Sequence, residues 1–117
     1  MFVQVKAGGG TKAGEHWQTE IAGIVEGTLG RFGDQITSVE VFVSDENSPE
    51  KQGSDDKRCV IEARLAGMQP IAVRTHAPTF EAAVSDCAEK IERTLDRRLG
   101  RLVDKDGHAH SAPEPQA

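Results

Sequence analysis

Aromatic side chains are scarce in this chain. Of its 117 residues, four are phenylalanine, one is tryptophan and none is tyrosine. Proteins that bind single-stranded nucleic acids by stacking bases need exposed aromatic rings on which the bases can lie. We therefore do not expect a base-stacking platform to be the main means of binding here.

An excess of positive charge is also missing. The chain has 14 lysine and arginine residues against 19 aspartate and glutamate residues, for a formal net charge of −5. General, non-specific nucleic-acid binders are basic overall, so this balance argues against that class. Any site for a polyanion must therefore be local.

Cysteines and long apolar runs are few. Cys59 and Cys87 are the only cysteines, and both occupy positions that are predicted to face inward. We expect two buried, reduced thiols, although a disulfide between them stays open from the sequence alone. No apolar run approaches the roughly 20 residues that span a membrane, and no charged and then apolar leader opens the chain. These features predict a cytoplasmic protein without a membrane partner.

Residues at catalytic or metal-binding spacing are absent as well. No cysteine or carboxylate stands at a recognised metal-site spacing from His16, His76, His108 or His110. The segment 44–47 offers a hydroxyl and carboxylates, but no histidine is close in sequence to activate a nucleophile. We expect no enzymatic activity, no metal, no cofactor and no small-molecule substrate.

Hydrophobic periodicity predicts the element order β-α-β-β-β-α. Strands are expected over residues 1–6, 36–43, 57–65 and 70–76, and helices over residues 15–32 and 79–102. A helix joins the first two strands, so they should be parallel, and hairpins should make the remaining neighbours antiparallel. The expected fold is α+β, a four-stranded mixed sheet with both helices packed on one face.

The domain organisation follows from the same pattern. Residues 1–102 are predicted to form a single domain, and residues 103–117 a disordered tail without apolar periodicity. The glycine-rich segment 7–14 matches neither a Walker A nor a dinucleotide-binding fingerprint, which favours a flexible connection over a phosphate cradle.

The last predicted helix separates its charges by sign. With Phe80 at zero and about 100° per residue, its apolar residues centre near 20–40°. One flank, at about 100–180°, carries carboxylates, and the other, at about 220–300°, carries cations. We call Glu81, Glu89, Glu92 and Asp96 the acidic flank, and Lys90, Arg93, Arg97 and Arg101 the basic stripe. Helices that only need solubility usually mix their signs at i,i+4, so this stripe is the most informative functional feature. A solvated helical face near a C-terminus explains four cations equally well.

Three segments together resemble one protein family. They are LGRFGDQITSVEVFVSDE at residues 29–46, DKRCVIEARLAGMQPIAV at residues 56–73 and FEAAVSDCAEKIERTLDRRLGRL at residues 80–102. In these segments the chain resembles the ribosome hibernation-promoting factors and ribosome-associated inhibitors, also called sigma-54 modulation or S30-type ribosomal proteins. The likeness covers roughly residues 1–102 and corresponds to the short form of the family.

The resemblance implies a translation inhibitor that binds the small ribosomal subunit in the decoding channel under stress, and we expect it to act as a monomer. Leu99 departs from the family's basic register, because lysine is common at that place. The rRNA contacts that the resemblance and the charge pattern suggest are Lys90, Arg93, Arg97, Arg98, Arg101 and Arg31.

Two other interpretations use different faces of the same fold. A protein-interaction regulator of the sigma-factor modulation type would bind through its acidic surface, the acidic flank and the loop at residues 44–47. An RNA-binding protein of another kind would use the open face of the sheet around Phe42, Arg58, Arg64 and Arg74.

Overall fold

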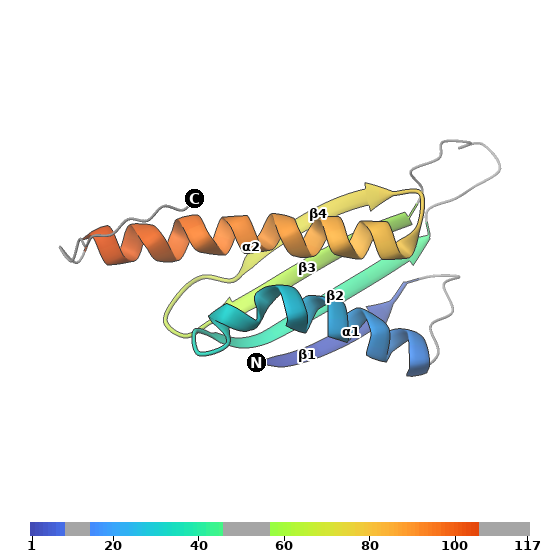
Figure 1. The fold of residues 1–117 in the computed structure, drawn as a ribbon, viewed down its shortest axis with the longest axis horizontal. Helices are drawn as coiled ribbons and strands as arrows, with labels where there is room; N and C mark the ends of the chain where they lie inside the picture. Colours follow the sequence, from blue (N-terminus) through green and yellow to red (C-terminus); the bar gives the residue numbers. More distant parts are fainter. Residues whose placement is uncertain (9–14, 46–56, 106–117) are drawn as a thin grey trace.

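Alternating apolar residues build a four-stranded sheet, and two helices cover one of its faces (Figure 1). The computed structural model describes residues 1–8, 15–45 and 57–105, with the backbone alone for residues 15–17 and 101–105. Its elements are, in order, β1 (Phe2–Ala7), α1 (Glu15–Leu29), the 3-10 helix η1 (Gly30–Phe32), β2 (Ile36–Asp45), β3 (Lys57–Leu65), β4 (Ile71–Ala77) and α2 (Phe80–Lys105). The predicted α+β fold and its element order are confirmed.

The strands lie in the order in which they occur along the chain. β1 and β2 pair in parallel, with Val3 opposite Val39, and the other two pairs are antiparallel. β1 and β4 are therefore the edges of the sheet. The crossover helix α1 lies over the β1 side, whereas α2 packs on β3 and β4.

The core lies between the sheet and the two helices. The inward residues of β2 and β3 are buried, as their alternation predicts, and the apolar line of α2 is fully covered. The largest side chains with almost no exposed surface are Leu29, Ile61, Ile91, Leu95, Val25, Val39, Val41, Val43 and Val84. Each such aliphatic side chain stabilises the fold by about 1.5–3 kcal/mol relative to an exposed position. No helix in the described ranges is long and apolar enough to cross a membrane.

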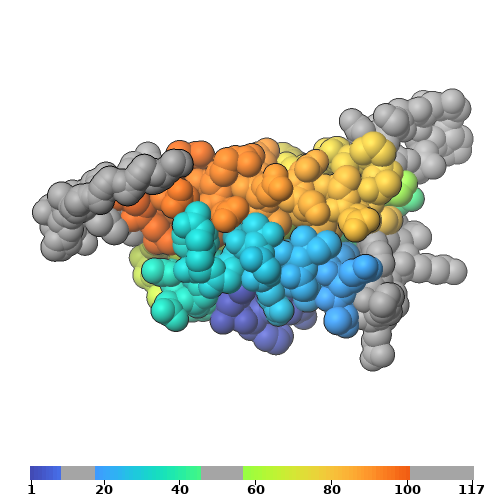
Figure 2. All heavy atoms as spheres, in the orientation of Figure 1, coloured from blue at the N-terminus to red at the C-terminus, as the bar shows by residue number. Residues whose placement is uncertain are grey.

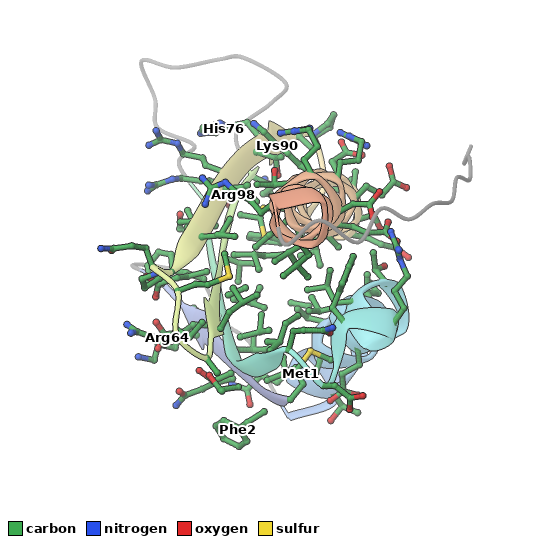
Figure 3. All side chains as sticks on the ribbon, turned by 90° about the vertical axis from the view of Figure 1, so that its left-hand side faces the viewer. Met1, Phe2, Arg64, His76, Lys90 and Arg98 are labelled. Carbon is green, nitrogen blue, oxygen red and sulfur yellow. The ribbon has the colours of Figure 1, made fainter. Side chains whose placement is uncertain are left out.

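The opposite face of the sheet carries mostly polar residues, and no helix of the described part of the chain covers it (Figure 3). This open face includes the residues that the alternation assigns to it, Gln4, Lys6, Glu40, Phe42, Arg58, Glu62, Arg64, Arg74 and His76. Phe42 is 37% exposed there, and its ring packs against the backbone of Gly8 at the end of β1. The sheet therefore has one apolar face and one hydrated face.

Element boundaries differ from the predicted ones by a few residues. β2 runs two residues further, to Asp45, and α2 ends at Lys105 rather than at residue 102. The start of the predicted tail is helical because no glycine or proline follows Gly100 until Gly107. The glycine-rich segment 9–14, the loop 46–56 and the rest of the tail, 106–117, lie outside the described residues.

Thr79 caps the N-terminus of α2. Its Oγ1 accepts a hydrogen bond of 3.1 Å from the backbone N–H of Ala82, and its carbonyl accepts another of 3.0 Å from Ala83. The N-cap hydroxyl satisfies a backbone donor that has no partner within the helix. Thr94 is the contrasting case, because its hydroxyl donates back to the carbonyl of Lys90 in mid-helix, where it serves no cap.

We predict that Thr79→Ala lowers the free energy of unfolding by about 1 kcal/mol, because it removes the N-cap hydrogen bond. Thr94→Ala is the matched control, and its stability should be unchanged or slightly higher because alanine has the better helix propensity. Urea unfolding followed by circular dichroism measures both. Equal losses in the two variants would contradict a capping role for Thr79.

The two cysteines meet where α2 packs on β3. Both are free thiols without exposed surface, and Cys87 Sγ lies 3.5 Å from the carbonyl oxygen of Cys59, as a weak donor to it. The side chain of Cys87 and burial in the core raise the pKa of the Cys59 thiol far above its usual range. The expected burial of both cysteines is confirmed, and their reduced state stays a prediction.

We predict that neither cysteine reacts with a thiol-directed disulfide reagent in the native state at pH 8, because the reactive form is an accessible thiolate. Both should react within the mixing time in guanidinium chloride. A Gln69→Cys variant, which places a thiol at an exposed position of the β3–β4 turn, is the positive control. Fast native labelling of Cys59 or Cys87 at a rate close to that of the control would overturn this prediction.

Candidate nucleic-acid interface

The packing of α2 fixes the direction in which its charged flanks point. Its apolar line rests on β3 and β4, so one flank must lie along the β4 edge and the other must face α1. The Nζ of Lys90 donates a hydrogen bond of 3.2 Å to the carbonyl oxygen of Arg74 in β4. The basic stripe therefore runs along the outer side of the molecule, beside the sheet edge.

The acidic flank faces the other helix. Figure 2 shows α1 and α2 side by side on the helical face of the molecule. Arg31, in η1 just after α1, lies 3.4 Å from the carboxylate of Glu92 and 3.6 Å from that of Asp96. Part of the acidic flank therefore binds an internal cation and is partly neutralised.

Arg31 is the predicted rRNA contact that the structure places apart from the others. Besides its two ion pairs with α2, its guanidinium lies over the ring of Phe32, 4.3 Å from the ring centroid. Arg31 thus connects η1 to α2 on the flank opposite the basic stripe. Arg31 therefore lies apart from the surface that the other predicted contacts form.

The middle of the basic stripe, and Arg98 next to it in the sequence, carry charges without partners among the described residues. Within the described ranges, the exposed side chains of Arg93, Arg97 and Arg98 make no hydrogen bond or ion pair. Arg98 is exposed although it falls on the sheet-facing line, near the end where α2 runs beyond the strands (Figure 1). Asp86, one turn before Lys90, lies on the same flank of α2 as the basic stripe and is a carboxylate that the sequence pattern of four cations does not include. Arg101 lies in α2, but its side chain is outside the described part.

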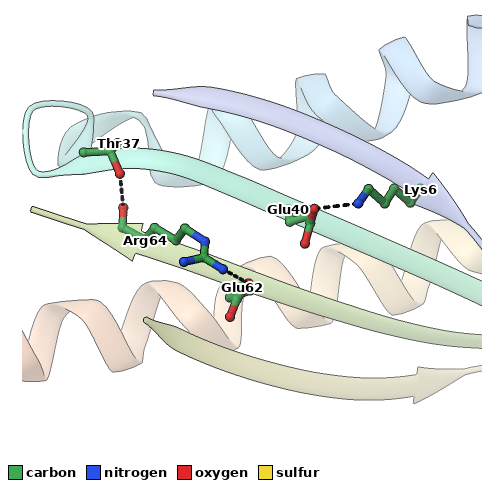
Figure 4. A network of polar contacts seen from close by, with 5 residues as sticks. All are labelled: Lys6, Thr37, Glu40, Glu62 and Arg64. Atoms are coloured by element: carbon green, nitrogen blue, oxygen red, sulfur yellow. Dashed lines mark hydrogen bonds and ion pairs between the residues drawn. The ribbon is translucent and has the colours of Figure 1, made fainter. Parts of the chain in front are cut away.

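The cations near β1 and the start of β2 are paired, in contrast (Figure 4). On the open face Lys6 Nζ lies 2.8 Å from Glu40, and Arg64 lies 3.5 Å from Glu62. Thr37 in addition donates a hydrogen bond of 2.9 Å to the carbonyl oxygen of Arg64. These pairs leave little uncompensated positive charge at this end of the open face.

Basic side chains gather instead where α2 meets β4. Figure 3 shows His76, Lys90 and Arg98 on the same side of the molecule, away from Arg64. The side chains of Arg58, Arg74 and Lys90 line one pocket at this edge. The basic stripe and the β4 end of the open face, which the sequence presents as separate binding surfaces, therefore join around the β4 edge.

Metal-binding and catalytic clusters are not part of this surface. Among the residues that the structure describes, no three His, Cys, Asp or Glu side chains come together in a way that could hold a metal ion. His76 lies on the open face of β4, and His108 and His110 lie outside the described residues.

A family model described as sigma 54 modulation protein / S30EA ribosomal protein matches residues 10–103. The chain belongs to this family. The match confirms the resemblance seen in the sequence and supports a ribosome-associated role. A comparison with curated proteins found no match to this chain.

Two solved structures share the fold of this S30EA family member. The N-terminal domain of Thermus thermophilus Protein Y superposes with a TM-score of 0.65 at 15% sequence identity, covering 83% of this chain and 98% of that one. A ribosomal subunit interface protein from Coxiella burnetii gives a TM-score of 0.63 at 16% identity, covering 86% and 99%. At these identities the likeness establishes the common fold.

The Lys6–Glu40 pair gives a direct test of the charge distribution. A hydrogen bond from Lys6 and its positive charge lower the pKa of the Glu40 carboxyl. We predict that Lys6→Met raises the pKa of Glu40 toward its ordinary value, whereas Lys90→Met leaves it unchanged. A carboxyl titration followed by NMR measures both variants, and an unchanged Glu40 pKa in Lys6→Met would show that the pair does not form in solution.

Proposed function

We propose that this protein is a translation inhibitor that binds the rRNA of the small ribosomal subunit through the basic stripe of α2. The observation that carries the proposal is the set of unpaired arginines, Arg93, Arg97 and Arg98, beside Lys90 on one side of the molecule. The family includes ribosomal proteins, which supports the ribosome as the binding partner.

Unpaired cations are the ones that gain most from a phosphate backbone. A lysine or arginine that neutralises a phosphate releases a condensed counterion, and this release drives binding largely independently of base identity. Arg31, Lys6 and Arg64 already have carboxylate partners, and a phosphate would have to displace them. Arg93, Arg97 and Arg98 have no such competitor among the described residues.

The geometry of the stripe suits a folded RNA. From Lys90 to Arg97 the helix rises about 10 Å, so several cations can reach neighbouring phosphates together. Arginine is well suited to this contact because its planar guanidinium binds phosphate oxygens through two parallel hydrogen bonds.

The acidic flank sets the orientation in the complex. Glu81, Glu89 and the carboxylates around Arg31 would be repelled by rRNA, so α1 should point away from it. The β4 edge and the basic stripe then face the RNA together. Such an orientation accounts for specific binding by a protein whose net charge is −5.

The proposed location and role come from the family resemblance. Binding in the decoding channel would occupy the place of mRNA and of the tRNA anticodon stems, and would hold the ribosome inactive under stress. Inhibition by occupancy requires no catalytic residue, which agrees with the expectation that the protein is not an enzyme.

We predict that the double reversal Arg93→Glu/Arg97→Glu abolishes co-sedimentation with small ribosomal subunits at moderate salt. Both positions are exposed and do not pack, so the circular dichroism spectrum and the unfolding midpoint should change little. The milder pair Arg93→Gln/Arg97→Gln should reduce the slope of log K against log salt by about 1.4–1.8, since each phosphate contact contributes about 0.7–0.9.

The matched control is Arg31→Gln/Arg64→Gln, which changes the net charge equally but alters only paired arginines. Its affinity for subunits should stay within about twofold of the unmodified protein, as expected when exposed ion pairs contribute little. If both double glutamine variants lost the same affinity for subunits, the binding would depend on net charge and not on the basic stripe. If Arg93→Glu/Arg97→Glu still co-sediments with small subunits, the basic stripe is only a solvated helical face and the proposal is wrong.

A further inference from the structure

A pocket of about 370 Å³ opens at the β4 edge, where the sheet and α2 meet. It is lined by Arg58, Val60, Ala72, Val73, Arg74 and Lys90. The volume lies at the lower end of the roughly 300–1,000 Å³ range of small-molecule sites. The pocket can therefore hold a ligand of about the size of one nucleotide.

The charged groups of this pocket are all cations. Lys90 is held in place by its hydrogen bond to the Arg74 carbonyl, so its ammonium stays at the rim. The guanidinium of Arg74 has no partner among the described residues. Arg58, which already has an interaction of its own, lines the pocket from β3. With no carboxylate in the lining, these groups select a compact anion with several oxygen atoms, such as a phosphate.

The rest of the pocket is apolar. Val60 stands directly opposite Arg74 across the β3–β4 ladder, and Ala72 lies two residues before Arg74 on the same face. The small side chain of Ala72 leaves room over the strands, and Val60 supplies aliphatic surface beside it. Val73, which packs against the core, lines the pocket from the side of α2. A flat ring can lie on such a surface while its phosphate meets the cations, with its plane also open to the Arg74 guanidinium.

We propose that this pocket binds one nucleoside 5′-phosphate. The phosphate lies between Lys90 and Arg74, with Arg58 on the third side, and the base covers Val60 and Ala72. A bare phosphate would leave the apolar surface uncovered, and an apolar ligand would leave Lys90 and Arg74 without a counter-charge. A nucleotide fits both the cationic part and the apolar part of the lining. The proposal is for binding alone, without a chemical reaction.

The nucleotide can be free or can belong to an RNA chain, since the phosphate and the base are the same in both. This inference goes beyond the proposed ribosome binding, and it connects to that function at one residue. Lys90 belongs to both the pocket and the basic stripe. A bound free nucleotide would therefore compete with RNA for this lysine.

The test is a titration of the full chain, labelled with ¹⁵N, by adenosine 5′-monophosphate in the absence of RNA. We expect saturable shifts of the backbone amides of Val60, Ala72, Val73 and Arg74, with adenosine and inorganic phosphate each binding at least about tenfold more weakly. Equal affinity for inorganic phosphate, or shifts confined to the exposed face of α2, would overturn the proposal.

Matched arginine variants locate the site. Arg74→Gln should weaken adenosine monophosphate binding about tenfold or more through loss of a charge-assisted hydrogen bond. Arg64→Gln removes the same group from the same sheet face outside the pocket, and should leave the affinity unchanged. Equal effects of the two variants would also overturn the assignment.

Two further measurements separate the pocket from the stripe and the two sources of the nucleotide. Arg93→Glu/Arg97→Glu should keep nucleotide binding within about threefold, so that failed ribosome binding and failed nucleotide binding are distinguishable. A 5′-phosphorylated adenosine trinucleotide that binds more tightly than the mononucleotide assigns the site to a nucleotide within RNA. Equal affinities assign it to a free nucleotide, and loss of all binding in the double reversal would contradict a separate pocket.

Discussion

The burial of one apolar line of α2 against β3 and β4 is the constraint on which the charge distribution depends. Val84, Ile91 and Leu95 are completely covered, and a rotation of the helix would bring them into water. Because that rotation is fixed, the cations that follow at about 220–300° must lie outside β4, and the carboxylates at about 100–180° must face α1. An amphipathic helix with a neutral polar face would fold equally well but would have no preferred surface for a polyanion.

Pairing within the protein sharpens this asymmetry. Lys6, Arg31 and Arg64 each lie beside a carboxylate, so their charges are largely compensated at short range. Arg74, Arg93, Arg97 and Arg98 have no such neighbour in the described part of the chain. The formal net charge of −5 therefore describes the electrostatic field far from the molecule, whereas the β4 side presents a positive field at contact distance.

Much of the fold follows from periodicity, but the shape of the site does not. Alternation in 57–65 and the 3.6-residue period of α2 predict which side chains enter the core, because burial imposes those periods directly. The ion pair of Arg31 joins it to Glu92, 61 positions away, and no local pattern in the sequence predicts such a contact. The sequence likewise does not show that the basic stripe meets the open face, since this depends on α2 packing on β3 and on the edge strand β4. Whether the stripe contacts rRNA stays a prediction.

The hydrogen bond from Lys90 to the Arg74 carbonyl also affects what the edge of the sheet offers to another molecule. β4 is an edge strand, and the outward backbone groups of an edge strand are a template on which a strand of another molecule can add. The Lys90 ammonium occupies one of those carbonyls and places a charge beside the edge, where an approaching strand would have to bury it. The lysine that is proposed to bind RNA therefore also disfavours the addition of a strand from another molecule to β4 when no RNA is bound.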